Sequence, residues 1–241
     1  MKIFSRAKLA VQNYQFKLWQ LRNPGATFKD YFAKIAKSDL ARGREHPTLG
    51  VKIGTAGQWK IQGLVKYGLK PDDVCVDYGC GTLRMGVRAI RFLNRGCYWG
   101  LDIDQGLLDE GTRLIGPELE SKAPHLRVIS PATVREAAEA NPAFLFSLKV
   151  LIHVHPDELD EYFANIITII GRSGRAIIEG KWSPGKTFQF GRQSWAHSLD
   201  SLTEIVARHG FRLAVIEETD RPFIVIGEVA KAGTLEVRAC G

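Results

Sequence analysis

The sequence predicts an α/β fold, in which a mostly parallel sheet is covered by helices on both faces and preceded by a helical extension. From residue 73 onward, short β-rich apolar runs alternate with segments of helical spacing, and such alternation is typical of parallel sheets. The last two expected strands, 211–220 and 221–231, are joined by a short turn, so they must be antiparallel. The 241 residues, 45% of them apolar, are enough for one domain with an extension.

The first seventy residues are expected to be mainly helical. An imperfect amphipathic helix is predicted up to Arg22, because apolar residues recur among basic ones and Asn23-Pro24-Gly25 stops the pattern. A second helix is expected over 27–43, followed by an irregular Gly-rich stretch and a short helix over 58–68. We therefore divide the chain into an extension, 1–60, and an α/β domain, 61–241.

Within the domain, five strands are expected before the closing pair, each followed by a helix. The strands are expected within 74–79, 97–104, 125–130, 143–154 and 174–182. The helices between them, together with the one before the closing pair, are expected over 84–94, 106–115, 133–140, 157–170 and 201–210. The last of these helices is expected to begin with a capping box from Ser201 to Glu204.

The basic excess of the chain lies in its N-terminal segment. Residues 1–70 hold 14 Lys and Arg against three acidic residues, a net charge of +11, while the remainder carries −4. A solvated helical face explains this pattern in one interpretation. In the other, the segment is attracted to an anionic partner: a phospholipid surface, a nucleic acid or an acidic substrate.

Composition also bears on the compartment. No apolar run approaches the length of a membrane span, and the first twenty residues lack the uninterrupted apolar stretch of a signal peptide. The four cysteines form no CxxC pair and no zinc-ligand spacing. We therefore expect a cytoplasmic protein with reduced cysteines and no metal site.

The stretch VDYGCGTLRMG, residues 76–86, follows the first expected strand of the domain. Gly79 and Gly81 would let the chain turn sharply and let a ligand approach the backbone. A dinucleotide loop would carry a third glycine where Arg84 stands, and the Gly-Lys-Ser/Thr of a triphosphate loop is absent. Asp77 instead suits a cofactor with an ammonium group, and Asp102, 21 residues after Gly81, suits the two hydroxyls of a ribose.

Residues 74–104 resemble motif I and the second-strand acid of class I S-adenosylmethionine-dependent methyltransferases, in the subgroup whose loop reads Gly-Cys-Gly-x-Leu-Arg. Residues 146–178 resemble the fourth strand, helix and fifth strand of that family. The resemblance runs from about 73 to 229 and departs from the common pattern at Leu83, where a third glycine often lies. It implies a Rossmann-like, seven-stranded sheet, S-adenosylmethionine as cofactor and S-adenosylhomocysteine as product. It also implies that the segment before the domain folds over the cofactor as a lid.

The resemblance further implies a set of cofactor-binding residues. Asp77 and the glycine loop would line the methionine and ribose, Asp102 would hold the ribose, and Ile103 and Ser130 would border the adenine. Arg84 would bind the cofactor carboxylate, bind an acidic substrate, or extend into water. The complete expected set is Asp77, Gly79, Cys80, Gly81, Leu83, Arg84, Asp102, Ile103, Ser130, Leu148 and Lys149.

Candidate residues for handling the methyl acceptor follow the fourth and fifth strands. His153 matches a histidine common in the family and is the candidate general base, since an imidazole titrates near neutrality. A long loop is expected after the fifth strand, and it mixes aromatic and basic residues, which suit a sugar ring, an anionic small molecule or stacked nucleobases. The expected acceptor-binding residues are His155, Trp182, Arg192, Trp195 and His197.

The sequence therefore predicts methyl transfer to an oxygen, or less readily a nitrogen, of a small molecule such as a sugar or secondary metabolite. One alternative is a tRNA or rRNA methyltransferase, which the N-terminal charge favours but the absence of an RNA-binding module disfavours. Another is a non-catalytic, cofactor-binding protein whose basic N-terminal helix makes a peripheral membrane contact.

Overall fold

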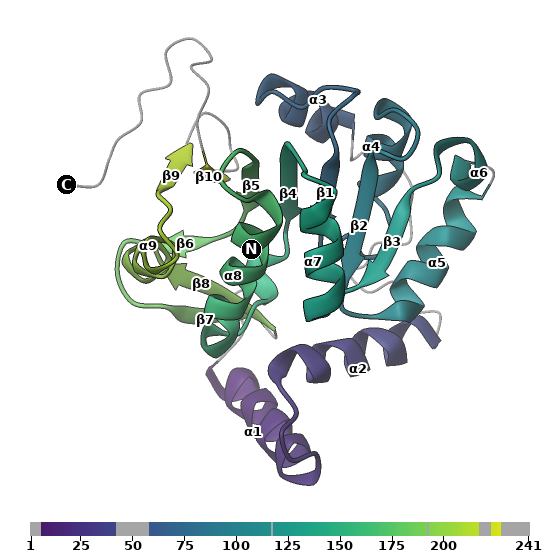
Figure 1. Ribbon diagram of the computed structural model, residues 1–241. Helices are drawn as coiled ribbons and strands as arrows, with labels where there is room; N and C mark the ends of the chain where they lie inside the picture. The colour runs from purple at the N-terminus through teal and green to yellow at the C-terminus, as the bar shows by residue number, and fades with distance from the viewer. Residues whose placement is uncertain (1–5, 42–57, 117, 192, 217–222, 228–241) are drawn as a thin grey trace.

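The computed structural model describes residues 6–41, 58–116, 118–191, 193–216 and 223–227. Its centre is a seven-stranded sheet with the order β3-β2-β1-β4-β5-β10-β9 (Figure 1). Strands β1 to β5 pair in parallel, and β10 is antiparallel to both β5 and β9. The seven strands are β1 (Cys75–Tyr78), β2 (Tyr98–Asp102), β3 (His125–Val128), β4 (Phe144–Leu148), β5 (Arg175–Glu179), β9 (Leu213–Ile216) and β10 (Phe223–Gly227).

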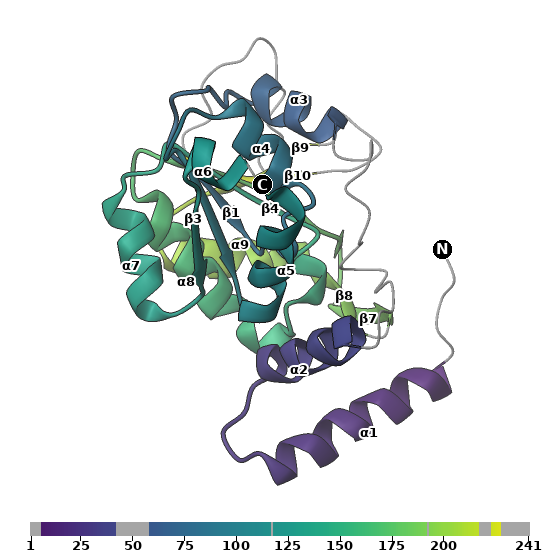
Figure 2. The ribbon, with the colours of Figure 1, turned by 90° about the vertical axis from the view of Figure 1, so that its right-hand side faces the viewer.

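Helices cover both faces of this sheet, as the sequence predicted (Figures 1 and 2). Alternate residues of a strand point to opposite faces, so Val76 packs in one apolar cluster and Cys75 in the other. The Cys75 face is covered by α3 (Gln58–Lys66), α4 (Gly86–Phe92) and α5 (Gln105–Ile115). The Val76 face is covered by α7 (Pro131–Glu139), α8 (Leu159–Ile170) and α9 (Leu199–Arg208).

Short polar side chains fix where several helices begin. The Asp104 carboxylate accepts the amide of Leu107 at the start of α5. The start of α9 differs from the prediction, since Ser198 rather than Ser201 caps this helix and accepts the Ser201 amide at 3.3 Å. The expected capping box was wrong because α9 begins at Leu199, two residues before the expected start at Ser201.

Three regions contain structure that the sequence analysis missed. A short helix α6 (Glu118–Lys122) follows α5, and 3₁₀ turns η2 (Leu151–His153) and η3 (Pro156–Glu158) follow β4. The segment after β5 was expected to be a long loop, but it forms a small sheet with the order β6-β8-β7. Its strands are β6 (Trp182–Ser183), β7 (Phe188–Gly191) and β8 (Ser194–Ser198).

The N-terminal helices α1 (Arg6–Arg22) and α2 (Phe28–Ala41) end close to the predicted positions. Figures 1 and 2 show α2 against the domain and α1 outside it. The Phe28 ring stacks on His155 at 5.3 Å and meets Trp195 edge-on at 4.8 Å between ring centres. Phe16 of α1 lies 5.1 Å from Phe28. We call the residues that join the helices to the domain in this way the docking cluster: Phe16, Phe28, Tyr31, His155 and Trp195.

Candidate functional site

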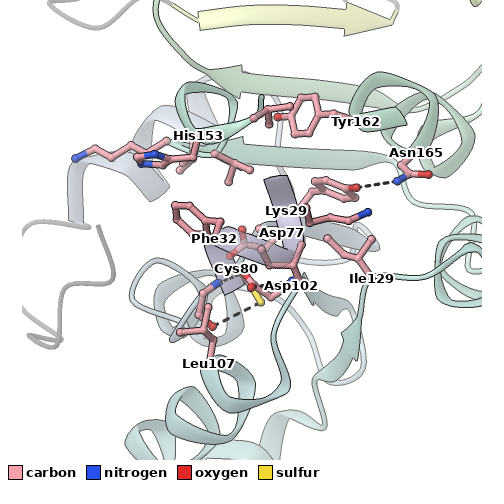
Figure 3. Close-up of a pocket in the computed structure, with 18 of the residues that line it drawn as sticks. Lys29, Phe32, Asp77, Cys80, Asp102, Leu107, Ile129, His153, Tyr162 and Asn165 are labelled. Atoms are coloured by element: carbon pink, nitrogen blue, oxygen red, sulfur yellow. Dashed lines mark hydrogen bonds between the residues drawn. The ribbon is translucent and has the colours of Figure 1, made fainter. Parts of the chain in front are cut away.

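A cavity of about 460 Å³ lies at the carboxyl edge of the sheet, where the strand order reverses between β1 and β4. Open α/β sheets bind their ligands at this position, and the volume lies within the range of small-molecule sites. Figure 3 shows His153 and Tyr162 on one side of the cavity and Asp77, Cys80 and Asp102 on the other. Elements β1, β2, β4, α2 and α8 all contribute lining residues.

The loop after β1 forms one wall of the cavity. Gly79 and Gly81 both have left-handed backbones, with φ of 84° and 55°. A Cβ atom on Gly79 would lie 2.3 Å from Val150 Cγ2, whereas one on Gly81 would meet no atom within 4 Å. Because Gly79 has no side chain, Val150 in the segment after β4 can pack against the loop. Gly81 leaves the backbone of the loop open to a ligand.

Leu83 does not line this cavity, although it was expected to bind the cofactor. Its backbone is left-handed, with φ of 58°, and its side chain is completely buried. A Cβ atom on Gly111 of α5 would lie 2.8 Å from Leu83 Cγ, and one on Gly86 would lie 3.0 Å from Leu83 Cδ2. Leu83 stands at the position where a third glycine often lies. Its side chain is directed into the core, where Gly86 and Gly111 leave room for it.

Asp77 and Asp102 lie at the ends of adjacent strands and have different partners. The Tyr98 hydroxyl donates to Asp77 Oδ2 at 2.8 Å, and burial beside Asp77 raises the pKa of Tyr98. The Asp102 carboxylate accepts the Gly81 amide at 2.7 Å and the Ile103 amide at 2.8 Å. Both carboxylates, which the sequence analysis expected to bind the cofactor, line the cavity.

The environment of Asp102 makes it easier to protonate than an ordinary carboxyl. Burial raises its pKa from 3.8 to about 6, and the three backbone amides that donate to it partly oppose that rise. Cys80, beside it, is also buried, and burial raises the pKa of its thiol well above the usual value. Cys80 is therefore a neutral thiol in the cavity wall and not an activated nucleophile.

Apolar side chains complete the wall near Asp102. Ile103 and Leu148, both expected to contact the cofactor, line the cavity, and Leu107 and Ile129 do so as well. Ser130 was expected there, but its hydroxyl caps α7 and accepts the Thr133 amide. The residue before it, Ile129, borders the cavity instead.

Arg84 and Lys149 bring positive charge to the cavity. Arg84 is half-buried, and within the described part of the chain its guanidinium forms no hydrogen bond or ion pair. Lys149 is exposed and has a left-handed backbone, with φ of 64°, where the chain leaves β4. Of the two, Arg84 is the better placed to meet an anionic group of a ligand, because it is only half exposed to solvent.

His153 reaches the cavity from η2. Its Nδ1 lies 2.5 Å from the main-chain oxygen of Gln193 and 3.4 Å from the Ser194 hydroxyl. A carbonyl oxygen can only accept a hydrogen bond, so Nδ1 carries a proton. The neutral imidazole then has its lone pair on Nε2, which gives His153 the tautomer that a base acting through Nε2 requires.

Helix α2 provides a wall that the sequence analysis missed. Lys29 and Phe32 line the cavity, and the Phe32 ring lies 5.4 Å from the ring of His153. The Lys29 amide donates to Glu158 at 3.0 Å, and its ammonium group pairs with Glu161 at 2.7 Å. The lid was expected just before the domain, where 42–57 lies outside the described residues, but α2 itself covers the cavity.

A polar network lines the cavity on the α8 side. The Ser147 hydroxyl donates to the main-chain oxygen of Tyr78 and accepts from the Tyr162 hydroxyl, each at 2.8 Å. Asn165 donates to the Tyr78 hydroxyl at 3.0 Å. Burial raises the pKa of both tyrosines, so they contribute neutral hydroxyls to the wall. No sequence pattern indicates this network, because its members come from three separate elements, β1, β4 and α8.

The expected acceptor-binding residues do not gather at the cavity. His155 and Trp195 belong to the docking cluster, and Trp182 packs against the apolar core from β6. His197 is fully buried, and its Nε2 contacts the main-chain oxygen of Leu151 at 3.0 Å. Arg192 lies outside the described residues. Aromatic and basic composition alone could not distinguish packing residues from binding residues here.

The described residues contain neither a cluster of metal ligands nor a helix that could span a membrane. Among them, no group of three or more His, Cys, Asp or Glu side chains is arranged to hold a metal ion. No helix in the described ranges has both the length and the apolar character needed to span a bilayer.

Comparison with known proteins identifies the fold. No model of a known protein family matches the sequence, and no curated protein matches it. An S-adenosylmethionine-dependent methyltransferase from Anabaena variabilis superposes with a TM-score of 0.62 at 10% identity, over 85% of this chain and 96% of that chain. The 1,6-didemethyltoxoflavin-N1-methyltransferase of Burkholderia thailandensis gives 0.52 at 19% identity, over 84% and 90%.

A third structure, magnesium protoporphyrin IX methyltransferase from Synechocystis with bound S-adenosylhomocysteine, gives a TM-score of 0.50 at 14% identity, over 92% of this chain and 99% of that one. At these identities the comparisons establish the fold. This chain has the Rossmann-like fold of class I S-adenosylmethionine-dependent methyltransferases, with seven strands and an antiparallel closing pair.

Proposed function

We propose that this protein is an S-adenosylmethionine-dependent methyltransferase that acts on an oxygen of a small molecule. The observation that carries the proposal is the bond between the Gly81 amide and the buried Asp102 carboxylate inside the cavity. This bond joins the turn after β1 to the end of β2. Two adjacent strand ends thereby form one binding surface for a nucleoside and its attached amino acid.

The residues present fit this cofactor. Asp102 offers carboxylate oxygens to the ribose hydroxyls, and Ile103, Ile129 and Leu148 offer an apolar surface to the adenine. Asp77 suits the ammonium group, and Arg84 suits the carboxylate. When bound, the cofactor supplies an electrophilic methyl group on a sulfonium, which transfers to a nucleophile by in-line displacement.

The protein's own part in the reaction is to position the acceptor and to take its proton. Nε2 of His153, which is shielded from solvent in this structure, would accept the proton of an acceptor hydroxyl as the oxygen gains the methyl group, which leaves a neutral ether or ester and a protonated imidazole. Gln193 supports this role because its main-chain oxygen keeps the proton on Nδ1. An oxygen acceptor is favoured over an amine because a hydroxyl needs such a base more.

The position of α2 over the cavity supports the proposal that the methyl acceptor is a small molecule. The side chains of Lys29 and Phe32 close part of the cavity, and two polar contacts and the docking cluster hold α2 against the domain. A folded RNA would have to displace α2 before one of its nucleobases could reach His153. A small molecule, in contrast, fits within the space that α2 covers. We place the activity in the cytoplasm, where Cys75, Cys80 and Cys97, all free thiols, would stay reduced.

Calorimetric titration with S-adenosylhomocysteine tests the cofactor. We expect micromolar-range binding that Asp102→Ala weakens strongly, while Asp109→Ala, on the exposed side of α5, leaves it unchanged. If the wild-type chain does not bind S-adenosylhomocysteine, the proposal fails. If it binds but transfers methyl groups to RNA in a salt-sensitive way, the small-molecule assignment is replaced by the RNA alternative.

A further inference from the structure

Helix α1 has apolar side chains on two opposite sides. On its inner side, Phe16 and Trp19 contact the aromatic rings of α2, with ring centres 5.1 and 5.2 Å apart. On its outer side, Val11, Tyr14 and Leu21 are 56%, 63% and 78% exposed. The contacts with α2 explain why the inner positions of α1 are apolar. They do not explain why the outer positions are apolar.

The outer residues form a continuous stripe. Val11, Tyr14, Leu18 and Leu21 follow one another at spacings of three and four, which places them along one side of a helix. We call these four residues the outer stripe. The described residues contain five exposed large apolar side chains, and three of them belong to this stripe. Figures 1 and 2 both show α1 at the outside of the described chain, and Leu18, the half-buried member of the stripe, lies at its border with α2.

The charges around the outer stripe are all of one sign. Helix α1 contains no Asp or Glu. Lys17 lies four residues before Leu21 on one border of the stripe, and Arg22 lies four residues after Leu18 on the other, both exposed. The surface is thus an apolar stripe with cationic borders.

This combination distinguishes the partners that could cover the stripe. A second copy of α1 would bring cations against cations, with no carboxylate on either helix to pair with them. A nucleic acid would neutralise Lys17 and Arg22 but would leave Val11 and Leu21 in water. An anionic bilayer can interact with both the apolar stripe and the cations beside it. Its acyl region buries the apolar side chains, and its anionic headgroups attract Lys17 and Arg22.

We propose that the outer stripe of α1 docks this protein onto anionic phospholipid bilayers. The helix would lie in the interface, with Val11, Leu18 and Leu21 toward the acyl chains. Tyr14 would sit at headgroup level, where tyrosine is enriched in membrane-associated proteins. Phe16 and Trp19 would keep α1 attached to α2, so the docked helix would carry the domain with it. This proposal does not depend on the methyltransferase assignment.

Co-sedimentation of the full chain with phosphatidylcholine–phosphatidylglycerol vesicles tests the proposal. We expect binding to these vesicles, little binding to phosphatidylcholine alone, and release as salt is raised. Lys17→Gln should weaken partitioning about fivefold, as expected for one cation near an anionic surface. The double variant Val11→Gln/Leu21→Gln should weaken it by about tenfold or more.

The control is Val65→Gln/Phe188→Gln, which removes two exposed apolar side chains, 41% and 49% exposed, outside α1. This control should bind vesicles as the wild type does. Circular dichroism should show all variants folded. The proposal is overturned if the wild type ignores anionic vesicles, if Val11→Gln/Leu21→Gln binds them normally, or if light scattering shows a dimer that this double variant dissociates.

Discussion

The main-chain oxygen of Gln193 lies 2.5 Å from Nδ1 of His153, and this contact determines which nitrogen of the imidazole can serve as a base. Gln193 lies just before β8, in the small sheet after β5, whereas His153 follows β4. Two segments forty residues apart thus set the tautomer of one side chain in the cavity.

Replacing His153 should therefore affect turnover rather than cofactor affinity. His153→Ala should lower the methyl-transfer rate by about 10²–10⁴, the usual contribution of a general base, and leave S-adenosylhomocysteine affinity unchanged. Ser194→Ala is the matched control, because the Ser194 hydroxyl lies 3.4 Å from Nδ1 and is not the principal partner. Steady-state kinetics and calorimetry measure the two effects. Wild-type turnover in His153→Ala would exclude it as the base.

Cofactor affinity should depend on pH through Asp102. Its pKa in the free protein is about 6, and ribose hydroxyls donate to the ionised form, so binding should lower this pKa. Affinity should then be constant above pH 6 and should fall below it, approaching tenfold per pH unit. Calorimetric titrations with S-adenosylhomocysteine from pH 5 to 8 measure this slope. Asp102→Asn should bind more weakly and show no slope, and an equal slope in that variant would contradict the assignment.

The role of Arg84 can be resolved with two ligands. Arg84→Gln should weaken S-adenosylhomocysteine binding by about tenfold or more, since a charge-assisted hydrogen bond contributes about 1.5–3 kcal/mol. It should not affect 5′-methylthioadenosine, which lacks the amino-acid end. Arg113→Gln, which removes an exposed ion pair with Glu110, should change neither. Equal loss for both ligands would show that Arg84 does not bind the carboxylate.

The packing of Leu83 against Gly111 predicts a coupled loss of stability and binding. In Gly111→Ala, the new Cβ would lie 2.8 Å from Leu83 Cγ and 2.9 Å from the main-chain carbon of Thr82, so the loop would have to shift. We expect a loss of about 1–3 kcal/mol in the free energy of unfolding, typical of overpacking. S-adenosylhomocysteine affinity should fall as well. Urea denaturation measures the first effect, and Gly185→Ala, with nothing within 4 Å, should be neutral.

The sheet could be predicted from the sequence because its signals are local. Short apolar runs such as Cys75–Tyr78 alternate with helical spacing, and the closing pair is linked by too few residues to be parallel. Asp77, Gly81 and Asp102 follow directly from that arrangement, because they lie at or just after the ends of β1 and β2.

The remaining wall of the cavity depends on contacts between distant segments. Phe32 and Lys29 reach it only because α2 packs on the domain, more than a hundred residues away from Glu158 and Glu161 in sequence. Trp195 and His197 looked like binding residues because the segment after β5 was expected to be a loop. Once the segment folds as a sheet, Trp195 packs against Phe28 and His197 is buried.

The most direct test of the central claim is methyl transfer from S-adenosylmethionine labelled in its methyl group into fractionated cell extract. We predict that the label enters a small-molecule fraction, that it is stable to treatment with ribonuclease and protease, and that Asp102→Ala abolishes the transfer. Label in RNA, or no transfer to any fraction by a chain that binds S-adenosylhomocysteine, would contradict the proposed function.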